Sequence, residues 1–378
     1  MDSITDKKAS KLHEISSQDV RILGLMSGTS LDGLDLCLAH FWKDSNAWQF
    51  AVEAAETRPY DAFWRQQLRQ AHELDTLPFL LLNKSYGKYL GEQCKDFLQR
   101  KNLKAGYIAS HGHTIFHQPG KGLTVQIGCG NTLAAAAGIS TIFDFRSLNV
   151  AHGGQGAPLV PIGDKLLFSG YSSCLNLGGF ANISFEQNGQ RIAYDACPCN
   201  IVLNKFAQEL GAEYDKNGEF ASSGVVCQPL LDELNNLDFY GQQGAKSLGR
   251  EWVENVFSKV FEKYKLDTKD KLRTTCEHVA MQVARCQVKG SVLVTGGGAF
   301  NSFLMQRISA LAHGEVAIPC SEIVNFKEAL IFAFLGTLYL NDEPNCWPSA
   351  TGARAPVIGG TLVKVLPKSL IDHVSSNG

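Results

Sequence analysis

The sequence lacks both a charge imbalance and a long hydrophobic run. Its 35 Lys and Arg residues nearly balance its 37 Asp and Glu residues, which gives a net charge of -2. Proteins that bind nucleic acid or a membrane surface by electrostatic attraction carry a basic excess, so we expect neither partner. The longest nearly apolar stretch, residues 329–340, is interrupted by Gly336 and Thr337. It is shorter than the ~20 residues that a membrane-spanning helix needs.

Paired cysteines and a secretory signal are lacking as well. The eleven cysteines include no Cys-x-x-Cys pair, and only Cys197 and Cys199 lie close together. Scattered cysteines with apolar neighbours are typical of buried thiols in a reducing compartment, not of a disulfide framework. Residues 1–19 are polar and have no apolar core of a signal peptide, so we expect them to form a flexible N-terminal tail. Together these features predict a cytoplasmic protein.

The composition and the order of patterns predict an α/β protein with two domains. A chain of 378 residues, 44% hydrophobic and 19% charged, is long enough for roughly two packed cores. Strand-like and helix-like segments alternate, which is typical of α/β folds. In the first half we expect strands at residues 20–26, 34–41, 48–57, 107–110 and 124–127 and helices at 77–98 and 131–137. In the second half we expect strands at 174–177, 183–185, 191–195 and 291–295, and helices from Asn200, through Phe303 and at 324–340.

Each half begins with two strands joined by a glycine-containing turn, which suggests two similar lobes that face one cleft. We place lobe I at residues 20–147 plus about 337–378, and lobe II at residues 148–336. The sequence contains neither a GxxxxGK[ST] loop nor a GxGxxG fingerprint. Instead, a turn rich in Gly, Ser, Thr and Asn follows a predicted strand at residues 27–33, 177–182 and 295–301. Any one could be an ordinary tight turn, but together they predict that backbone N–H groups hold a nucleotide between the lobes.

These turns belong to a longer series of motifs. In chain order, the series is GLMSGTSLDGLD (residues 24–35), SHGHT, TVQIG, DFR, GGQGAPLVP, LNLGGFANIS, YDACPCN and TGGGAFN. It closely resembles the anhydro-N-acetylmuramic acid kinases over about residues 21–352. That family belongs to the actin-like ATPase superfamily, with the sugar kinases. The resemblance therefore implies two similar ribonuclease H-like lobes, each a five-stranded sheet with helices, that close on ATP and Mg²⁺.

The resemblance also implies a reaction and a catalytic residue. In the family, water opens the 1,6-anhydro bridge of the sugar while the freed 6-oxygen takes the γ-phosphate of ATP, which yields N-acetylmuramic acid 6-phosphate and ADP. The aspartate that acts as general base on the water corresponds to Asp195 in YDACPCN. Because Asp195 shortly precedes a predicted helix, we expect the helix N-terminus to lower its pKa. The alternative role of Asp195 is merely to stabilise that helix dipole.

By the same resemblance, three segments are expected to bind ATP. The residues concerned are Gly28, Thr29, Ser30, Leu31, Asp32, Gly33, Leu34 and Asp35 in the first, Gly178, Gly179 and Asn182 in the second, and Gly296, Gly297 and Gly298 in the third. Asp32 and Asp35 are candidates to hold Mg²⁺ through water, since Mg²⁺ favours carboxylates and retained waters. Either aspartate could instead be a simple polar position of its turn or strand.

Four residues are expected to bind the sugar: His111, Thr114, Arg146 and Glu328. The resemblance makes the SHGHT segment, taken as a loop, a wall of the sugar pocket; loop packing is the alternative. His111, His113 and His117 also raise the possibility of a metal site, although no carboxylate or cysteine cluster accompanies them. Arg146 could pair with a lactyl carboxylate or a phosphate, or with Asp144 of its own segment. Glu328 could equally be a charge at a helix N-terminus.

Two departures from the family pattern bear on the substrate. Ala196, Cys197 and Cys199 replace positions that the family writes as Asp-x-Gly-Pro-Gly-Asn, and Asn149 stands where the family commonly has an aspartate. These changes motivate a rival hypothesis, a kinase of another anhydrosugar or of a hexose. A further rival is an ATP-gated chaperone-like protein, although the ~40 residues after Leu340 are too few for a client-binding domain. The expected partners are ATP and a small anhydro-sugar, with a homodimer possible.

Overall fold

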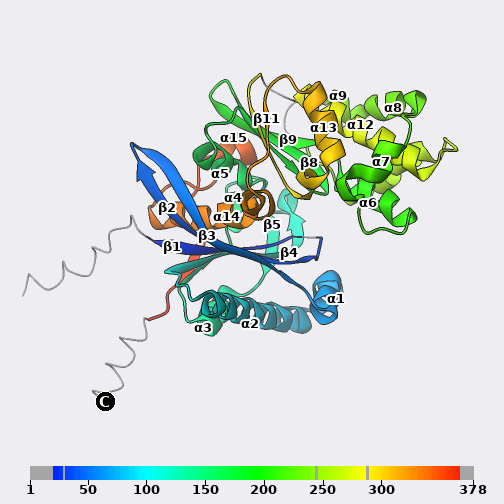
Figure 1. Cartoon of the computed structure of the whole chain (residues 1–378). Helices are drawn as coiled ribbons and strands as arrows, with labels where there is room; N and C mark the ends of the chain where they lie inside the picture. The colour runs from blue at the N-terminus through cyan, green and yellow to red at the C-terminus, as the bar shows by residue number, and fades with distance from the viewer. Residues whose placement is uncertain (1–19, 29, 243–245, 287–288, 367–378) are drawn as a thin grey trace, which may run out of the picture. The chain divides into compact units, whose positions relative to one another are not determined.

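The computed structural model describes residues 20–28, 30–242, 246–286 and 289–366 (Figure 1). The predicted N-terminal tail and Thr29 lie outside these residues. The chain divides into two compact units: unit 1 comprises Met1–Gly163 and Glu328–Gly378, and unit 2 comprises Asp164–Lys327. Unit 1 thus includes residues 148–163 and 328–336, which the sequence analysis assigned to lobe II. The reason is long-range packing: the Asn149 side chain bonds to Thr351, and Ala329 packs against Gly24, all within unit 1.

Unit 1 is built on a mostly antiparallel sheet of order β12-β6-β4-β1-β2-β3, with β5 paired to β4. Strands β1, β2 and β3 form an antiparallel meander, whereas β4 and β6 follow in parallel to β1. The strands are β1 (Arg21–Ser27), β2 (Gly33–Asp44), β3 (Ala47–Pro59), β4 (Tyr107–Gln118), β5 (Leu123–Ile127), β6 (Thr141–Phe143) and β12 (Thr361–Val363).

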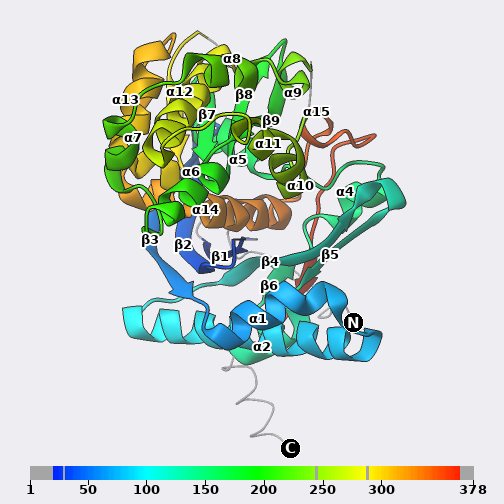
Figure 2. The same cartoon turned by 90° about the vertical axis from the view of Figure 1, so that its right-hand side faces the viewer.

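Helices cover both faces of this sheet. The long helix α2 (Thr76–Lys101) and α3 (Gly130–Ala137) lie on one face, and the unit 1 part of α14 (Ser321–Leu340) lies on the other (Figures 1 and 2). Gly24 in β1 lets α14 approach closely, because a Cβ there would lie 1.9 Å from the carbonyl oxygen of Ala329. The remaining helices are α1 (Ala62–Gln70), α4 (Ser147–Ala151), α5 (Val160–Leu167, which continues into unit 2) and α15 (Pro348–Thr351), with the turns η1 (Ala71–Glu73) and η2 (Pro119–Lys121).

Unit 2 has a sheet of order β11-β10-β7-β8-β9. Its strands are β7 (Ser173–Leu177), β8 (Phe180–Gln187), β9 (Gln190–Pro198), β10 (Val292–Thr295) and β11 (Val316–Ala317). Its helices are α6 (Asn200–Glu209), α7 (Glu219–Ser223), α8 (Gln228–Asn235), α9 (Asp238–Gly241), α10 (Arg250–Trp252), α11 (Ser258–Phe261), α12 (Thr268–Cys286) and α13 (Ser302–Leu311), with the 3-10 helices η3 (Lys216–Gly218) and η5 (Gly297–Phe300) and the π-helix η4 (Val253–Phe257). The apolar faces of α6, α8 and α12 share one core with the sheet.

The two units have the same strand topology. In unit 1 the order is β3-β2-β1-β4-β6, and in unit 2 it is β9-β8-β7-β10-β11. In both, three antiparallel strands are followed by two that run parallel to the first. This repetition confirms the predicted α/β class with two similar units. One local expectation was wrong: the SHGHT segment is not a loop, because β4 continues through it to Gln118.

Helix α14 is long and apolar enough to cross a membrane by length and composition alone. In the part of the chain that the structure describes, it is the single helix of this kind, and 67% of its most apolar window is buried inside the protein. The core helix of a folded domain has the same character.

Candidate active site

The β1–β2 turn leaves open space in front of one of its glycines. The N–H of Leu31 donates to the carbonyl of Gly28 (3.3 Å), and Leu31 adopts a left-handed φ of 63°. A Cβ on Gly28 would meet only the Ser30 hydroxyl, at 3.7 Å, so protein packing does not require this glycine. Gly33 differs, because a Cβ there would lie 2.5 Å from the carbonyl oxygen of Arg58. Leu34 is buried in the core of unit 1, which leaves only its main chain for ligand contacts.

Carboxylates gather next to this turn. Asp32 is exposed, whereas Asp35 is half-buried and accepts a 2.6 Å hydrogen bond from the Thr57 hydroxyl on β3. The pKa of Asp35 is raised to about 6: burial is the main cause, the Thr57 hydrogen bond lowers it, and the charges of Glu328 and Asp32 contribute to the rise. The structure thus brings together Asp35, Asp32 and Glu328 of unit 1, which the sequence analysis had assigned to two ligands.

The half-buried Arg146 and the buried His111 form a pair. The Arg146 guanidinium donates from Nε (3.1 Å) and Nη2 (2.9 Å) to Nε2 of His111, and from Nη1 to the carbonyl of Gly156 (2.6 Å). Nδ1 of His111 lies 3.0 Å from the carbonyl oxygen of Gly112, which can only accept, so Nδ1 carries the proton. Burial, and then the Arg146 charge, hold the pKa of His111 well below its usual value. His111 is therefore a neutral acceptor.

The guanidinium is held as a cation near a carboxylate. Burial lowers the pKa of Arg146 to about 10, and the charge of Glu328 acts in the opposite direction. Arg146 donates to His111 and Gly156 and not to Asp144, the alternative raised by the sequence; Asp144 accepts from the N–H of Ser147 at the start of α4. A half-buried, forked cation with a neutral histidine and a nearby glutamate can recognise a carboxylate or phosphate.

A buried polar chain that the sequence analysis missed lies below the β1–β2 turn. Tyr86 and Tyr60 are hydrogen-bonded (2.6 Å), Tyr60 donates to the hydroxyl of Ser27 (2.7 Å), and Ser27 lies 2.8 Å from Nδ1 of His113. Burial raises the pKa of Tyr60 to about 12 and lowers that of His113 to about 4, so these groups stay neutral. Ser27 directly precedes Gly28, so the chain fixes the base of the turn. Tyr60 and Tyr86 lie in no glycine-rich motif, and no local signal marks them.

Thr114 of the SHGHT segment and His117 beyond it have protein partners. The Thr114 hydroxyl accepts from the side-chain amide of Gln126 (3.3 Å), and Nδ1 of His117 lies 3.1 Å from the Thr124 hydroxyl. Among the residues that the structure describes, no three His, Cys, Asp or Glu side chains form a metal-binding group. The metal hypothesis for His111, His113 and His117 therefore has no support from the described geometry.

In unit 2, the second and third glycine-rich turns meet at one end of the sheet. The carbonyls of Gly178 and Gly179 accept from the N–H groups of Asn200 (3.1 Å) and Cys199 (2.8 Å) and so attach the hairpin to α6. Gly296 has a φ of 83°, and a Cβ on Gly298 would lie 2.7 Å from Cβ of Leu177. Packing therefore requires glycine at these two positions.

Three other glycines of these turns have no such requirement. A Cβ on Gly178 would find its nearest neighbour at 3.5 Å, one on Gly297 at 3.8 Å and one on Gly179 at 3.9 Å. In unit 2 these three glycines leave room at the backbone that phosphate oxygens can occupy, with main-chain N–H groups as donors, and Gly28 leaves similar room in unit 1. The residues present thus fit a bound nucleotide.

Asp195 lies on β9 at a bulge in the β8–β9 ladder. Ala181 pairs with Cys197 and Asn182 with Asp195, so Ala196 is the additional residue. Bulges re-aim side chains and are common beside active sites. The Asn182 amide, which the sequence analysis assigned to phosphate, donates to Oδ1 of Asp195, and the N–H of Leu248 donates to Oδ2 (2.7 Å).

The expected pKa of Asp195 was wrong in direction. Burial raises it above the usual value, and the hydrogen bonds from Leu248 and Asn182 lower it by less. The physical reason is that Asp195 sits in a strand, five residues before α6 begins, where loss of solvent outweighs any helix dipole. A half-buried carboxylate with a raised pKa is a stronger base than the sequence analysis expected.

The departures from the family pattern are buried. Ala196, Cys197 and Cys199 belong to the core of unit 2. The Asn149 side chain uses all its groups internally: it accepts from the N–H of Gly156 (2.7 Å) and donates to Thr351 (2.9 Å) and to Cys346. Since Gly156 in turn accepts from Arg146, Asn149 orders the GGQGAP segment that holds the guanidinium.

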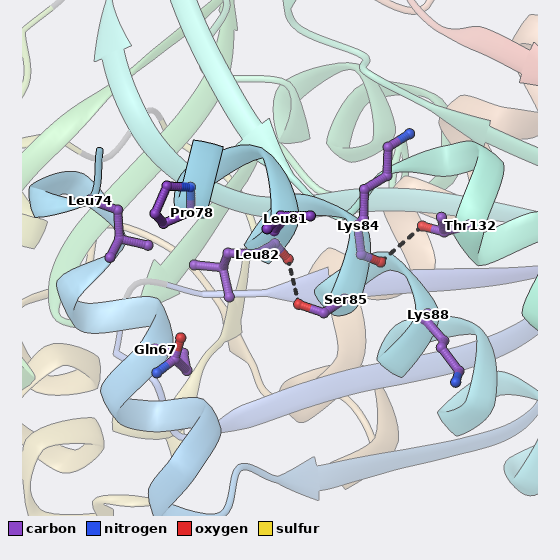
Figure 3. A pocket seen from close by; sticks show the side chains of 9 residues that line it. All are labelled: Gln67, Leu74, Pro78, Leu81, Leu82, Lys84, Ser85, Lys88 and Thr132. Atoms are coloured by element: carbon purple, nitrogen blue, oxygen red, sulfur yellow. Dashed lines mark hydrogen bonds between the residues drawn. The ribbon is translucent and has the colours of Figure 1, made fainter. Parts of the chain in front are cut away.

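A pocket of about 590 Å³ lies elsewhere in unit 1, over α1, η1, α2 and α3. Figure 3 shows its lining residues, among them Leu74, Leu81 and Lys88. Leu77, Leu80 and Leu81 on the same helix are more than half exposed. None of the predicted site residues lines this pocket.

Comparison with known proteins identifies the family. The chain matches the family model described as anhydro-N-acetylmuramic acid kinase over residues 20–365. It belongs to the anhydro-N-acetylmuramic acid kinase family. Relatives that carry this name include one from Vibrio cholerae, 33% identical over 359 residues, covering 88% of this chain and 95% of the relative. Another, from Shewanella oneidensis, is 34% identical over 362 residues, covering 89% and 97%. These matches confirm the resemblance seen in the motifs.

Solved structures show a weaker similarity. The (R)-2-hydroxyglutaryl-CoA dehydratase component A of Acidaminococcus fermentans has a TM-score of 0.43 at 13% identity, covering 82% of this chain and 95% of that one. A ROK hexokinase from Thermus thermophilus has a TM-score of 0.37 at 11% identity, covering 84% and 99%.

Proposed function

We propose that this member of the family converts 1,6-anhydro-N-acetylmuramic acid, water and ATP to N-acetylmuramic acid 6-phosphate and ADP. The observation that carries the proposal is Asp195, a half-buried carboxylate oriented by Asn182 and Leu248 and located beside an open glycine turn. Family membership supplies the reaction, and Asp195 supplies the general base that the hydrolytic half of the reaction requires.

In the proposed mechanism, Asp195 takes a proton from water. Its raised pKa strengthens it as a base, and its two hydrogen bonds orient the carboxylate. The oxygen of that water attacks the anomeric carbon, and the bond from this carbon to the bridging oxygen breaks. The freed 6-oxygen then bonds to the γ-phosphorus of ATP while the bond from that phosphorus to the β,γ-bridging oxygen breaks, so ADP leaves. The proton held by Asp195 is released to solvent. A positioned general base contributes roughly 10²–10⁴-fold to such a step.

The glycine-rich turns are the proposed nucleotide contacts, as the family resemblance implies. Gly28, Gly178, Gly179 and Gly297 leave room at the backbone, and Gly296 and Gly298 shape the third turn. Mg²⁺, bound with the nucleotide, neutralises phosphate charge. Asp35 and Asp32 are its proposed partners through water, since neighbouring carboxylates suit a hydrated Mg²⁺.

The sugar is assigned to the Arg146 cluster of unit 1. The forked guanidinium suits the lactyl carboxylate, and His111 keeps it in place as a neutral acceptor. Glu328 and Thr114 complete the proposed set as hydrogen-bond partners of sugar hydroxyls. We further propose a cytoplasmic location; a homodimer stays a prediction that sedimentation of the purified protein tests.

The decisive experiment uses oxygen-18 water with ATP and the anhydro-sugar. The proposal requires one ¹⁸O at the anomeric hydroxyl and a phosphate on the sugar, both detected by mass spectrometry. Asp195→Asn should fold and bind nucleotide but lose at least about 100-fold in rate. Phosphorylation of a plain hexose, without turnover of the anhydro-sugar, would favour the rival hexose kinase. Steady ATP hydrolysis without any sugar would favour the chaperone-like ATPase.

A further inference from the structure

The Asp195 carboxylate is held partly by a segment without regular secondary structure. One oxygen is bonded to Asn182, the cross-strand neighbour that the sheet itself fixes. The other accepts from the N–H of Leu248, between α9 and α10, while the N–H of Asp195 donates to the carbonyl of Lys246 (3.0 Å). Residues 246–248 thus hold both the main chain and the side chain of Asp195, and its orientation depends on where this segment lies.

The side chain of Lys246 fixes the segment to α9. Its ammonium donates to the carbonyls of Phe239 (3.2 Å) and Gln242 (3.4 Å). The same ammonium lies 4.7 Å from the ring centre of Phe239 and 5.5 Å from that of Tyr194, the residue directly before Asp195. Lys246 is half-buried, and cation–π attraction strengthens when a cation is partly removed from water.

Helix α9 is itself a firm anchor. The Tyr240 hydroxyl lies 2.8 Å from Nε2 of His278, and Nδ1 of His278 lies 2.8 Å from the side-chain oxygen of Asn235. Because that oxygen can only accept, Nδ1 donates and Nε2 accepts from Tyr240. Burial lowers the pKa of His278 to about 3, so the ring stays neutral and the chain of bonds keeps its direction. Phe239 is buried in the same region and contacts Trp252.

We infer that Lys246 is a positioning residue for the catalytic base. By tying residues 246–248 to α9, it holds the N–H of Leu248 against Asp195 and so fixes the carboxylate toward the water it activates. This inference rests on the proposed role of Asp195. Lys246 touches no reacting atom; it acts through the main chain on either side of Ser247.

Loss of the Lys246 contacts should raise the pKa of Asp195, an effect that a purely structural role of Lys246 would not have. When the N–H of Leu248 moves away, the Asp195 anion loses a hydrogen bond that lowers its pKa, so the pKa rises. The groups that face Asp195 are the neutral Asn182 amide of β8, the Cys197 thiol of β9 and the Lys246 segment. Neither the Asn182 amide nor the Cys197 thiol carries a positive charge that would compensate for the lost hydrogen bond from Leu248. Since the base must be ionised, the acidic limb of the rate profile moves to higher pH.

The test compares Lys246→Met, which keeps the apolar stem, with Lys246→Arg, which keeps a cation able to donate and stack. For Lys246→Met we expect kcat to fall about tenfold and the acidic limb of kcat to move up by roughly half a pH unit or more. KM for ATP stays unchanged, and Lys246→Arg recovers most of the rate. If Lys246→Met does not fold, Lys246→Gln carries the test, since its amide is neutral but keeps two N–H donors; a smaller loss with the same direction of pH shift is expected.

The control is Lys263→Met, which removes another lysine of unit 2 that pairs with Glu233 at the surface. It should leave kcat and the pH profile unchanged. Asp195→Asn distinguishes the inference about Lys246 from the proposed role of Asp195 as the base. If Asp195→Asn is inactive while Lys246→Met keeps the wild-type rate and profile, the inference about Lys246 is overturned and the proposed function stands. If Asp195→Asn stays active, the proposed base itself is wrong.

Discussion

The ammonium of Lys327 donates to the carboxylate of Asp164 over 3.0 Å, and both side chains are almost completely buried, at 3% and 4% exposed. Asp164 is the residue at which the chain enters unit 2, and Lys327 is the residue at which it leaves. Ser184 donates to the other oxygen of Asp164, and Arg191 lies 4.0 Å away from it. The pair thus joins the first and last residues of unit 2 to its sheet.

Removal of one partner should therefore destabilise unit 2. Lys327→Met leaves the buried Asp164 carboxylate without its closest cation, and such a change costs about 3–5 kcal/mol. Unfolding by urea, followed by circular dichroism, measures the loss. The matched control is Lys165→Met, which breaks the surface pair with Glu186 and should cost less than about 1 kcal/mol. Equal stability of the two variants would show that the buried pair contributes no more than a surface pair.

Two glycine substitutions should separate ligand binding from folding. Gly179→Ala adds a Cβ whose nearest neighbour is 3.9 Å away, so stability should not change. The methyl group would occupy the space assigned to phosphate and weaken a charge-assisted contact, which lowers nucleotide affinity about tenfold or more. Isothermal titration with ADP measures this effect. Wild-type nucleotide affinity in Gly179→Ala would remove the second hairpin from the ATP site.

Gly298→Ala, in contrast, should lower the stability of unit 2. Its Cβ would lie 2.7 Å from Cβ of Leu177, and overpacking of this kind costs about 1–3 kcal/mol. Thermal unfolding should report the loss directly.

Local patterns in the sequence were enough to predict most strands and the glycine-rich turns, but not the short strands β6, β11 and β12. The β1–β2 and β7–β8 hairpins follow from short apolar runs around glycines, because alternation and turn residues act over a few positions. The repeated hairpin also predicted two similar units. The unit boundary was less accessible, since it depends on contacts such as Asn149 with Thr351, about 200 positions apart.

The electrostatics of the site were not predictable in the same way. Asp195 appeared close to a helix start in the sequence, which favours a lowered pKa, but its burial depends on the packing of a whole unit. Its partner Leu248 is 53 positions away, and no motif marks it. The pairing of Arg146 with His111 likewise joins positions 35 apart. Residue types of the site can be recognised locally, whereas their protonation and partners are set by tertiary contacts.

The raised pKa of Asp35 predicts a pH-dependent response to Mg²⁺. With a pKa of about 6, Asp35 is mostly ionised at pH 7.5 and mostly protonated at pH 5. The gain in ADP affinity on adding Mg²⁺ should fall about tenfold between these pH values, since only the anion attracts the hydrated cation. The nucleotide also titrates in this range, so Asp35→Asn is the reference. A Mg²⁺ effect with the same pH dependence in both proteins would exclude Asp35 as a partner of the cation.

Arg146→Lys should change which sugar the enzyme prefers. Lysine keeps the charge but lacks the planar guanidinium, which donates to His111 and to the carbonyl of Gly156 from separate nitrogens, so the fork that suits a carboxylate is lost. We expect kcat/KM for 1,6-anhydro-N-acetylmuramic acid to fall about tenfold or more, which corresponds to one charge-assisted bond. The same ratio for 1,6-anhydro-N-acetylglucosamine, which has no lactyl carboxylate, should change much less. An equal loss for both sugars would mean that Arg146 orders the site without reading the carboxylate.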